Sequence, residues 1–457
     1  MDAWEVWQES LFQRVTPLRS PDFVVDSLTR ERLSLVVIDN IAAMISAASE
    51  PAVVELSAQR VSRTCLQEAT TVTGHHIDAQ SAAFVNAIAG GWNEVDEGYR
   101  PATCHAGLYT LPVVMAEVER QQGRVADVFR GLLAGYEVAT AYARAFSPPK
   151  PYRLHPHATL STIGAASGLS IVAQGDVPCV REVVPVAASM AMIGTFAHAP
   201  RGLLMRNGWA GQAAVGGFTA MDFASVGLLS DIHEVRCLFE DVLGFPMNDE
   251  EIASEREAWA ILDGYHKPYA CCQYIHSAVE AALALTADSA CGIRPDTVER
   301  VIVRTHPLAL NLDNTNPTTD LGAKFSVPHC VASVLTFGST EPATFSSTYL
   351  DHPDIRRIRS QVHVELFDDV GPPPHDRPAE VTVELIDGMT FKSVCMSARG
   401  GPDRPLDRGE ILHKAKSLTI DSRPNFIEAA TALLEGRIVG SDSWSDFLQT
   451  AGLRNSS

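Results

Sequence analysis

The feature that most constrains this fold is a change in side-chain periodicity near Asp263. Before it, apolar residues recur at the spacing that predicts amphipathic helices. Ala, Gly and Ser dominate the faces of these segments, so the helices can pack closely. Neither a strand–helix–strand alternation nor a GxGxxG nucleotide loop occurs in this part of the chain. We predict helices over residues 24–45, 79–89, 111–118, 125–146 and 159–173.

Strand signals follow the change. The dipeptide Asp387-Gly388 is typical of a tight hairpin turn, and the residues on either side of it read as strands. Two further segments alternate apolar and polar side chains. We predict strands over residues 297–305, 361–367, 380–386 and 389–396, with helical runs among them over residues 275–285 and 328–337.

Helical periodicity returns after Pro405, over residues 410–418 and 426–434. A chain of 457 residues is too long for one ordinary hydrophobic core, so two domains are expected. We predict a mainly α protein with an inserted α+β domain. Both chain ends, residues 1–262 and 405–457, form the helical domain, and residues 263–404 form the α+β domain.

Charge and sorting signals narrow the class of protein. The formal net charge of −19 disfavours nucleic acid or an anionic membrane as a partner. The N-terminus lacks the pattern of a signal peptide, and apolar stretches such as residues 35–48 are too short to span a bilayer. Nine cysteines occur without a CxxC pair, which favours reduced thiols in the cytoplasm.

Residues 91–107 gather Glu94, Asp96, Glu97 and His105 in a link between two Ala-rich helices. Loops held by rigid helices are common places for functional side chains. The alternative is a solvated acidic loop.

A second candidate segment is residues 152–159, where His155 and His157 flank a proline before a small-residue helix. A helix N-terminus favours anions and lowers the pKa of a nearby histidine. The alternative is a pair of exposed loop histidines. No third ligand at a suitable spacing is evident, so we predict neither a metal nor an organic cofactor.

Two cationic segments complete the set. Arg206 lies among small residues, and arginine suits bidentate binding of a carboxylate. Lys267 and His276 lie at the predicted domain junction, where an anion site is plausible. Cys272 is interpreted as a buried structural thiol, because no base can be assigned to it.

The order of these motifs resembles the MmgE/PrpD family over about residues 20–440. The most specific parts are the segment around Lys267 and residues 323–328 (Ala-Lys-Phe-Ser-Val-Pro). The family includes 2-methylcitrate dehydratases, cis-aconitate decarboxylases and iminodisuccinate epimerases. The resemblance implies a helical domain from both chain ends, a smaller α+β lid domain, a site in the cleft between them, and a homodimer.

The resemblance also implies roles for individual residues. Its motif positions fall on the catalytic candidates His105, His155, Lys267 and Asp96. The substrate-binding candidates are Glu94, Tyr99, Arg206, His276 and His329. Many relatives have Asp-Asp where this chain has Asp96-Glu97, and His-Pro-Gly where it has His-Ala-Gly at residues 105–107. His329 replaces a frequent tyrosine, and Arg206 replaces a lysine of the decarboxylase branch.

The shared chemistry of the family is proton movement at a carbon next to a carboxylate. His105 and His155 are the expected acid/base pair, and Lys267 and Arg206 the expected carboxylate clamps. We therefore expect a cofactor-free lyase, a dehydratase or decarboxylase, acting on a small di- or tricarboxylate. The alternatives are an epimerase or isomerase of a carboxylate such as iminodisuccinate, or a catalytically inactive binding relative.

Overall fold

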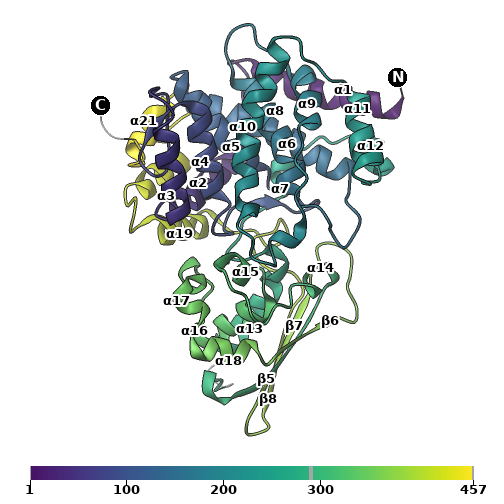
Figure 1. The fold of residues 1–457 in the computed structure, drawn as a ribbon, viewed down its shortest axis with the longest axis vertical. Coiled ribbons are helices and arrows are strands. Elements are labelled where there is room, and N and C mark those ends of the chain that lie inside the picture. The colour runs from purple at the N-terminus through teal and green to yellow at the C-terminus, as the bar shows by residue number, and fades with distance from the viewer. Residues whose placement is uncertain (1, 288–291, 455–457) are drawn as a thin grey trace.

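The computed structural model describes residues 2–287 and 292–454, and it is mainly helical with a small mixed sheet (Figure 1). The predicted helices of the first part are present. They belong to the series α1 (Ala3–Val15), α2 (Ser27–Ser46), α3 (Pro51–Val61), α4 (Ala79–Gly90), α5 (Ala106–Arg120), α6 (Val125–Ala145), α7 (Pro156–Thr159), α8 (Ser161–Val172), α9 (Val180–Ser189), α10 (Met205–Ser225), α11 (Ile232–Cys237) and α12 (Asp249–Ile252).

Small residues and capping side chains explain this helical part. Asp26 caps α2 by accepting a hydrogen bond from the backbone N–H of Thr29, which satisfies a free helix-end donor. Helices α6 and α8 pack closely because glycines face the contact. A Cβ added to Gly135 would lie 2.6 Å from the carbonyl oxygen of Gly164, closer than side chains tolerate.

The later part of the chain contains a four-stranded sheet in the order β6-β5-β7-β8. Only the β5–β6 pair is parallel, and the predicted hairpin is confirmed as β7–β8. Gly388 supplies the positive φ of 87° that this turn needs. The elements are β5 (Val298–Thr305), β6 (Val362–Leu366), β7 (Ala379–Leu385), β8 (Thr390–Cys395), α13 (His276–Ala287), α14 (Pro307–Leu310), α15 (Asp320–Lys324), α16 (Val327–Phe337), α17 (Ser347–Leu350) and α18 (Pro353–Arg359).

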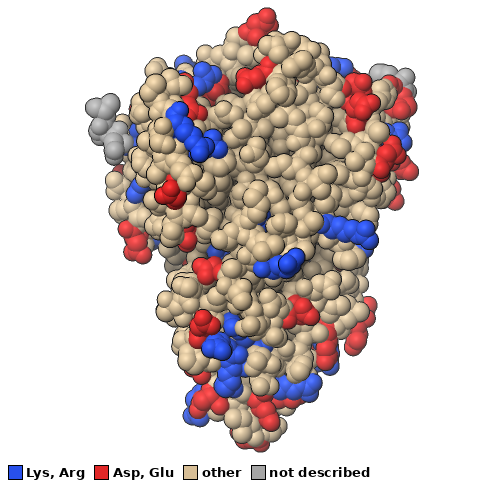
Figure 2. Space-filling model, in the orientation of Figure 1, with Lys and Arg blue, Asp and Glu red and all other residues tan. Residues whose placement is uncertain are grey.

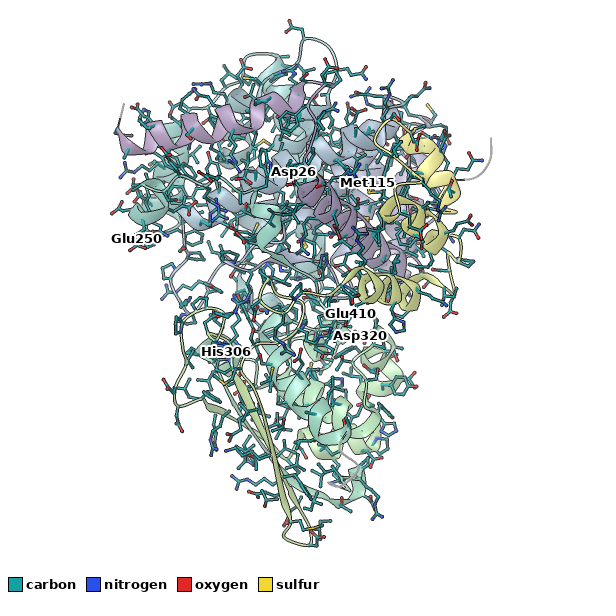
Figure 3. The ribbon with its side chains drawn as sticks, turned by 180° about the vertical axis from the view of Figure 1, so that it is seen from behind. Asp26, Met115, Glu250, His306, Asp320 and Glu410 are labelled. Carbon is teal, nitrogen blue, oxygen red and sulfur yellow. The ribbon has the colours of Figure 1, made fainter. Side chains whose placement is uncertain are left out.

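Buried apolar side chains form two large cores. The first combines residues 4–261 with residues 406–453, and the second consists mostly of residues 270–395. The returning helices α19 (Arg408–Thr419), α20 (Phe426–Leu434) and α21 (Trp444–Thr450) lie beside the N-terminal helices, and α19 packs on α2 (Figure 1). Seen from behind, Glu410 marks α19 at the level where the helical part meets the α+β part (Figure 3).

The chain before residue 263 also contains short strands, which the sequence analysis did not predict. One pair is β1 (Ala69–Thr70) with β2 (His76–Ile77). The other joins β3 (Gly98–Tyr99) to β4 (Gly264–Tyr265), which are far apart in the sequence. A Cβ at Gly98 would overlap the ring of Tyr265, so glycine is required there. This second pair places the acidic segment, residues 91–107, beside Lys267.

Among the described residues, no single helix combines the length and apolar character needed to cross a membrane. Helices α2 and α3 meet that criterion only as a pair, and they are bent by 94° at the break between them.

Candidate active site

The central cavity lies where the helical part meets the α+β part, and its volume is about 40 Å³. The acidic segment and the residues before α7 and at the start of α10 supply its walls on the helical side. The segment after β4 supplies the opposite wall. Six of the residues predicted from the sequence line it: Glu94, Tyr99, His105, His155, Arg206 and Lys267.

Four buried charges connect these segments. Glu94 forms ion pairs with Arg206 and with Lys267, whose Nζ lies 3.0 Å from Oε2 of Glu94. The Nζ of Lys267 also lies 3.2 Å from Oδ1 of Asp96. Arg206 and Lys267 are each 1% exposed, so both cations lie in the interior of the protein. Asp96 lies behind the cavity wall rather than in it.

The pairing keeps Lys267, Glu94 and Asp96 charged. Burial alone would lower the pKa of Lys267, but Asp96 and Glu94 outweigh it and hold that pKa above its usual value. Burial would raise the pKa of Asp96 and of Glu94, but the neighbouring cations lower both. Removing one partner would leave an uncompensated charge in the interior, which is strongly unfavourable.

The backbone of Glu94 has a positive φ of 56°, which is unusual for a residue with a side chain. Arg206 contributes to holding this bend, because its Nη1 donates to the carbonyl oxygen of Gly91 at 2.9 Å. Strained backbone of this kind persists where the surroundings over-determine it.

His105 has one proton position fixed by its neighbours. Its Nδ1 lies 2.7 Å from Oδ2 of Asp96 and 3.0 Å from the carbonyl oxygen of Glu97. Both neighbours only accept hydrogen bonds, so Nδ1 carries the proton in neutral His105. The lone pair is then on Nε2, and Asp96 stabilises the cation that forms when Nε2 takes a proton.

His155 has the opposite tautomer. Its Nδ1 accepts a hydrogen bond from the backbone N–H of His157 at 3.2 Å, so neutral His155 carries its proton on Nε2. Burial, together with Arg206 and His105, lowers its pKa well below the usual value and keeps the ring neutral. The ring stacks on Phe196 with centroids 5.5 Å apart.

His157 is buried, not an exposed loop residue. Its ring lies edge-on to those of His155 and His105, with centroids 4.5 and 4.8 Å away. Its Nδ1 lies 2.9 Å from the hydroxyl of Tyr109. Within residues 2–287 and 292–454, no group of three or more His, Cys, Asp or Glu side chains could hold a metal ion.

Two of the predicted substrate-binding residues, His276 and His329, do not line the central cavity. His276 begins α13, and its Nε2 lies 3.3 Å from the carbonyl oxygen of Cys271. His329 is in α16, packed against Phe345 and with its Nδ1 3.4 Å from Arg359. Burial lowers the pKa of each to about 3, so both rings are neutral packing groups.

Several cavity residues were not predicted, and Arg377 is the most informative. It lies in the loop before β7 and contacts the ring of Tyr274, 5.0 Å from its centroid. Tyr274 also lines the cavity, and its carbonyl oxygen lies 3.0 Å from Nε2 of His306, which follows β5 (Figure 3). A lone arginine in a Pro-rich stretch gives no sequence signal for this position.

Cys272 also lines the cavity. Burial raises the pKa of its thiol to about 12, which agrees with an unreactive buried cysteine rather than a nucleophile.

The family-like segment of residues 323–328 supports the acidic segment from the other side. Nζ of Lys324 donates to Oδ1 of Asn93 at 2.9 Å and to the carbonyl oxygen of Trp92 at 3.2 Å. Burial lowers the pKa of Lys324 to about 8, although Asp320 and Glu94 oppose the change. Lys324 does not line the cavity, so its role there is support.

The side chain of Glu97 explains why residue 107, two positions after His105, is a glycine. Its Oε1 accepts the backbone N–H of Gly107 at 2.7 Å, and its Oε2 accepts the hydroxyl of Tyr136 at 3.0 Å. A Cβ at residue 107 would overlap this carboxyl group. Burial raises the pKa of Glu97 to about 8, despite the two donors.

The mainly helical fold, the small α+β part and the convergent motif residues define a recognisable class of protein. Residues 22–244 match the MmgE/PrpD N-terminal domain, and residues 269–439 match the MmgE/PrpD C-terminal domain. The chain belongs to the MmgE/PrpD family, as its motifs predicted.

Two curated relatives are similar along most of their length. The cis-aconitate decarboxylase of Mus musculus is 25% identical over 356 residues, which are 74% of this chain and 71% of the relative. The cis-aconitate decarboxylase of Homo sapiens is 25% identical over 354 residues, 74% of this chain and 72% of the relative. Family and relatives together support a dehydratase or decarboxylase type of function.

The raised pKa of Glu97 predicts a pH-dependent stability. Between the ordinary value of 4.5 and about 8, the folded protein holds a proton that the unfolded chain releases. The free energy of unfolding therefore falls as pH rises through this window, by up to about 1.4 kcal/mol per pH unit. Glu97→Gln removes this contribution, which urea unfolding across the window measures. Glu435→Gln, on the exposed surface, is the control. An unchanged slope in Glu97→Gln would contradict the assignment.

Proposed function

We propose that this protein is a lyase that moves a proton at a carbon next to a carboxylate of a small di- or tricarboxylate. The observation that carries the proposal is the pair of opposite tautomers at one cavity. His105 presents a basic Nε2 backed by Asp96, and His155 presents a neutral Nε2–H donor. No hydrogen bond from the described residues occupies either Nε2, so both are free for a substrate.

The two histidines then have different tasks. His105 carries the proton, because Asp96 stabilises its cation. A neutral His155 is a poor proton donor, since it would become an imidazolate. We therefore assign it as a hydrogen-bond donor to the negative charge that develops on the substrate. This refines the expected acid/base pair.

Dehydration and decarboxylation use the same proton carrier in opposite directions. In dehydration, Nε2 of His105 takes the proton from the carbon, and the C–H electron pair forms the C=C bond. The hydroxide that leaves takes that proton back and departs as water. In decarboxylation, the C–C electron pair stays on the substrate as CO₂ leaves, and protonated His105 gives its Nε2 proton to the carbon. Water then restores the proton of His105.

Substrate carboxylates need a cation that is not already neutralised. Glu94 and Asp96 balance Arg206 and Lys267, so that cluster has no excess charge. Lys267 still has one N–H beyond its two ion pairs, so it can contact the substrate.

The second cationic group does have an excess. Asp376 pairs with Arg100 at 2.5 Å and lies 3.6 Å from Nε of Arg377, so two arginines share one carboxylate. Arg377 lines the cavity, and we assign it as the main anchor of a substrate carboxylate.

A cavity of about 40 Å³ holds water but not a tricarboxylate, which needs about 300 Å³ or more. We propose that residues 263–404 form a lid domain that moves away from the helical domain to admit substrate. The lining supports this division, because His105 and His155 come from the helical part and Lys267 and Arg377 from the proposed lid.

Epimerisation is the second candidate, because a proton carrier and a neutral donor at one cavity would also serve that reaction. The test is to incubate the protein separately with cis-aconitate, 2-methylcitrate and iminodisuccinate. We expect CO₂ release or a new double bond with one of the first two.

Variants tie the activity to the cavity. His155→Ala should lower kcat by about 100-fold or more, the scale for losing one aligned donor, and His155→Gln should lose less. His105→Asn should lower it at least as much. His233→Ala, on an exposed side chain, is the control. Racemisation of iminodisuccinate alone would favour the epimerase. Binding without turnover of any of the three would favour an inactive relative.

Arg377 offers a separate prediction. Arg377→Lys keeps the charge but loses the planar fork, and Arg377→Ala loses both, so KM should rise by about 10-fold and 100-fold respectively, with smaller effects on kcat. Steady-state kinetics measure this. Arg300→Ala, on the exposed face of β5, should leave KM unchanged. A normal KM in Arg377→Ala would exclude the anchor role.

We also propose a homodimer that uses the face over α10. Figure 2 shows few charged side chains there. The last turn of α10 and the residues that follow it expose Phe223, Val226, Leu228 and Leu229. Analytical ultracentrifugation should give twice the monomer mass, and Phe223→Asp with Leu229→Asp should shift it toward the monomer. Val394→Asp, on the exposed side of β8, is the control. A monomeric native chain would refute the proposal.

A further inference from the structure

A second cavity adjoins the central cavity and differs from it in character. This side chamber has a volume of about 160 Å³. Its lining combines polar groups with apolar side chains, which include Ala102, Ala143, Phe146, Leu160, Phe239 and Phe245. Its other walls include the loop between α6 and α7, where Ser147 and Lys150 are exposed. None of these residues has a role in the proton chemistry described above.

The side chamber and the central cavity share two lining residues, Thr103 and Pro156. Oγ1 of Thr103 lies 2.9 Å from the hydroxyl of Tyr274, which lines the central cavity. It also lies 3.2 Å from the hydroxyl of Tyr152, which lines the side chamber. The boundary between the two cavities is therefore a few side chains thick. Pro156 directly follows His155, so the side chamber begins next to the proposed donor.

We propose that the side chamber binds an apolar substituent of the carboxylate whose reacting end occupies the central cavity. The substrate class is then a small carboxylate with a short alkyl or aryl branch. A cavity of about 150 Å³ is large enough for a benzene ring. The volume of the side chamber, about 160 Å³, therefore suits a substituent of about that size. The lining supports this division. Glu94, Arg206, Lys267 and Arg377 line the central cavity, whereas Lys150 is the single charged side chain among the residues that line the side chamber.

The inference rests on the proposed function for the identity of the reacting end, but its test does not need turnover. The probes are succinate and benzylsuccinate, which share two carboxylates and differ by one benzyl group. Calorimetry on the full-length protein should give a Kd for benzylsuccinate about 10- to 100-fold below that for succinate, because the phenyl group leaves water.

Filling variants locate the effect. Ala143→Leu, in α6, and Ala102→Leu, in the half-exposed loop, should each remove the advantage of benzylsuccinate and leave the Kd for succinate within about twofold. Ala102→Leu keeps the test valid if the buried Ala143 site does not tolerate leucine. Ala52→Leu, on the exposed face of α3, is the matched control.

The outcomes separate the two proposals. Equal affinities for both probes in the native protein, or equal losses for both in the filling variants, would overturn the side-chamber proposal. Equal losses in the filling variants would indicate that the side chamber is a path by which both probes enter the central cavity. Preferential binding of benzylsuccinate with no turnover of any family substrate would support the side chamber and count against the proposed function.

Discussion

The pairing of Glu94 with Arg206 and Lys267 is the interaction on which the rest of the site depends. It joins three segments that are distant in sequence, and it does so in the interior, where an unpaired charge is strongly unfavourable. The unusual backbone of Glu94 turns the acidic segment so that Asp96 lies behind His105. One electrostatic constraint therefore sets the position of the carboxylates, the proton location on His105 and the direction of the lysine.

Steric fit supports this electrostatic arrangement. The short strand pair β3–β4 holds the acidic segment against the segment of Lys267, and a glycine at residue 98 is needed for the close approach. Gly107 has a similar role, because it leaves room for the buried carboxyl of Glu97. The chain has Glu97 where many relatives have aspartate, and the longer side chain reaches both Gly107 and Tyr136. The buried carboxyl of Glu97 thus has donors for both of its oxygens.

The sequence predicted the architecture well because periodicity reports local structure. The four strands of the sheet lie where alternation placed them, and the hairpin forms at Asp387-Gly388. The order of the motifs also predicted that His105, His155 and Lys267 lie at one cavity, and all three line the central cavity. Periodicity does not report side-chain direction across tertiary contacts, which is why His276 and His329 face other partners. Arg377 was missed for the same reason. It lines the central cavity, but its position depends on how β7 aligns with that cavity. The two-residue strands β1 to β4 were not predicted, because a segment of two residues is too short to show an alternation of apolar and polar side chains.

The first hydrophobic core combines side chains from both ends of the chain, whereas the second comes mostly from one continuous stretch, residues 270–395. This arrangement has a consequence for biosynthesis. The continuous stretch can bury its apolar residues as soon as it leaves the ribosome, but the helices made first must wait for Trp444 and Phe447 before their core is complete. During that interval the N-terminal helices expose apolar surface. A nascent chain of this protein is therefore most vulnerable to aggregation in its earliest-made part, and dependence on chaperones should persist until the last residues emerge.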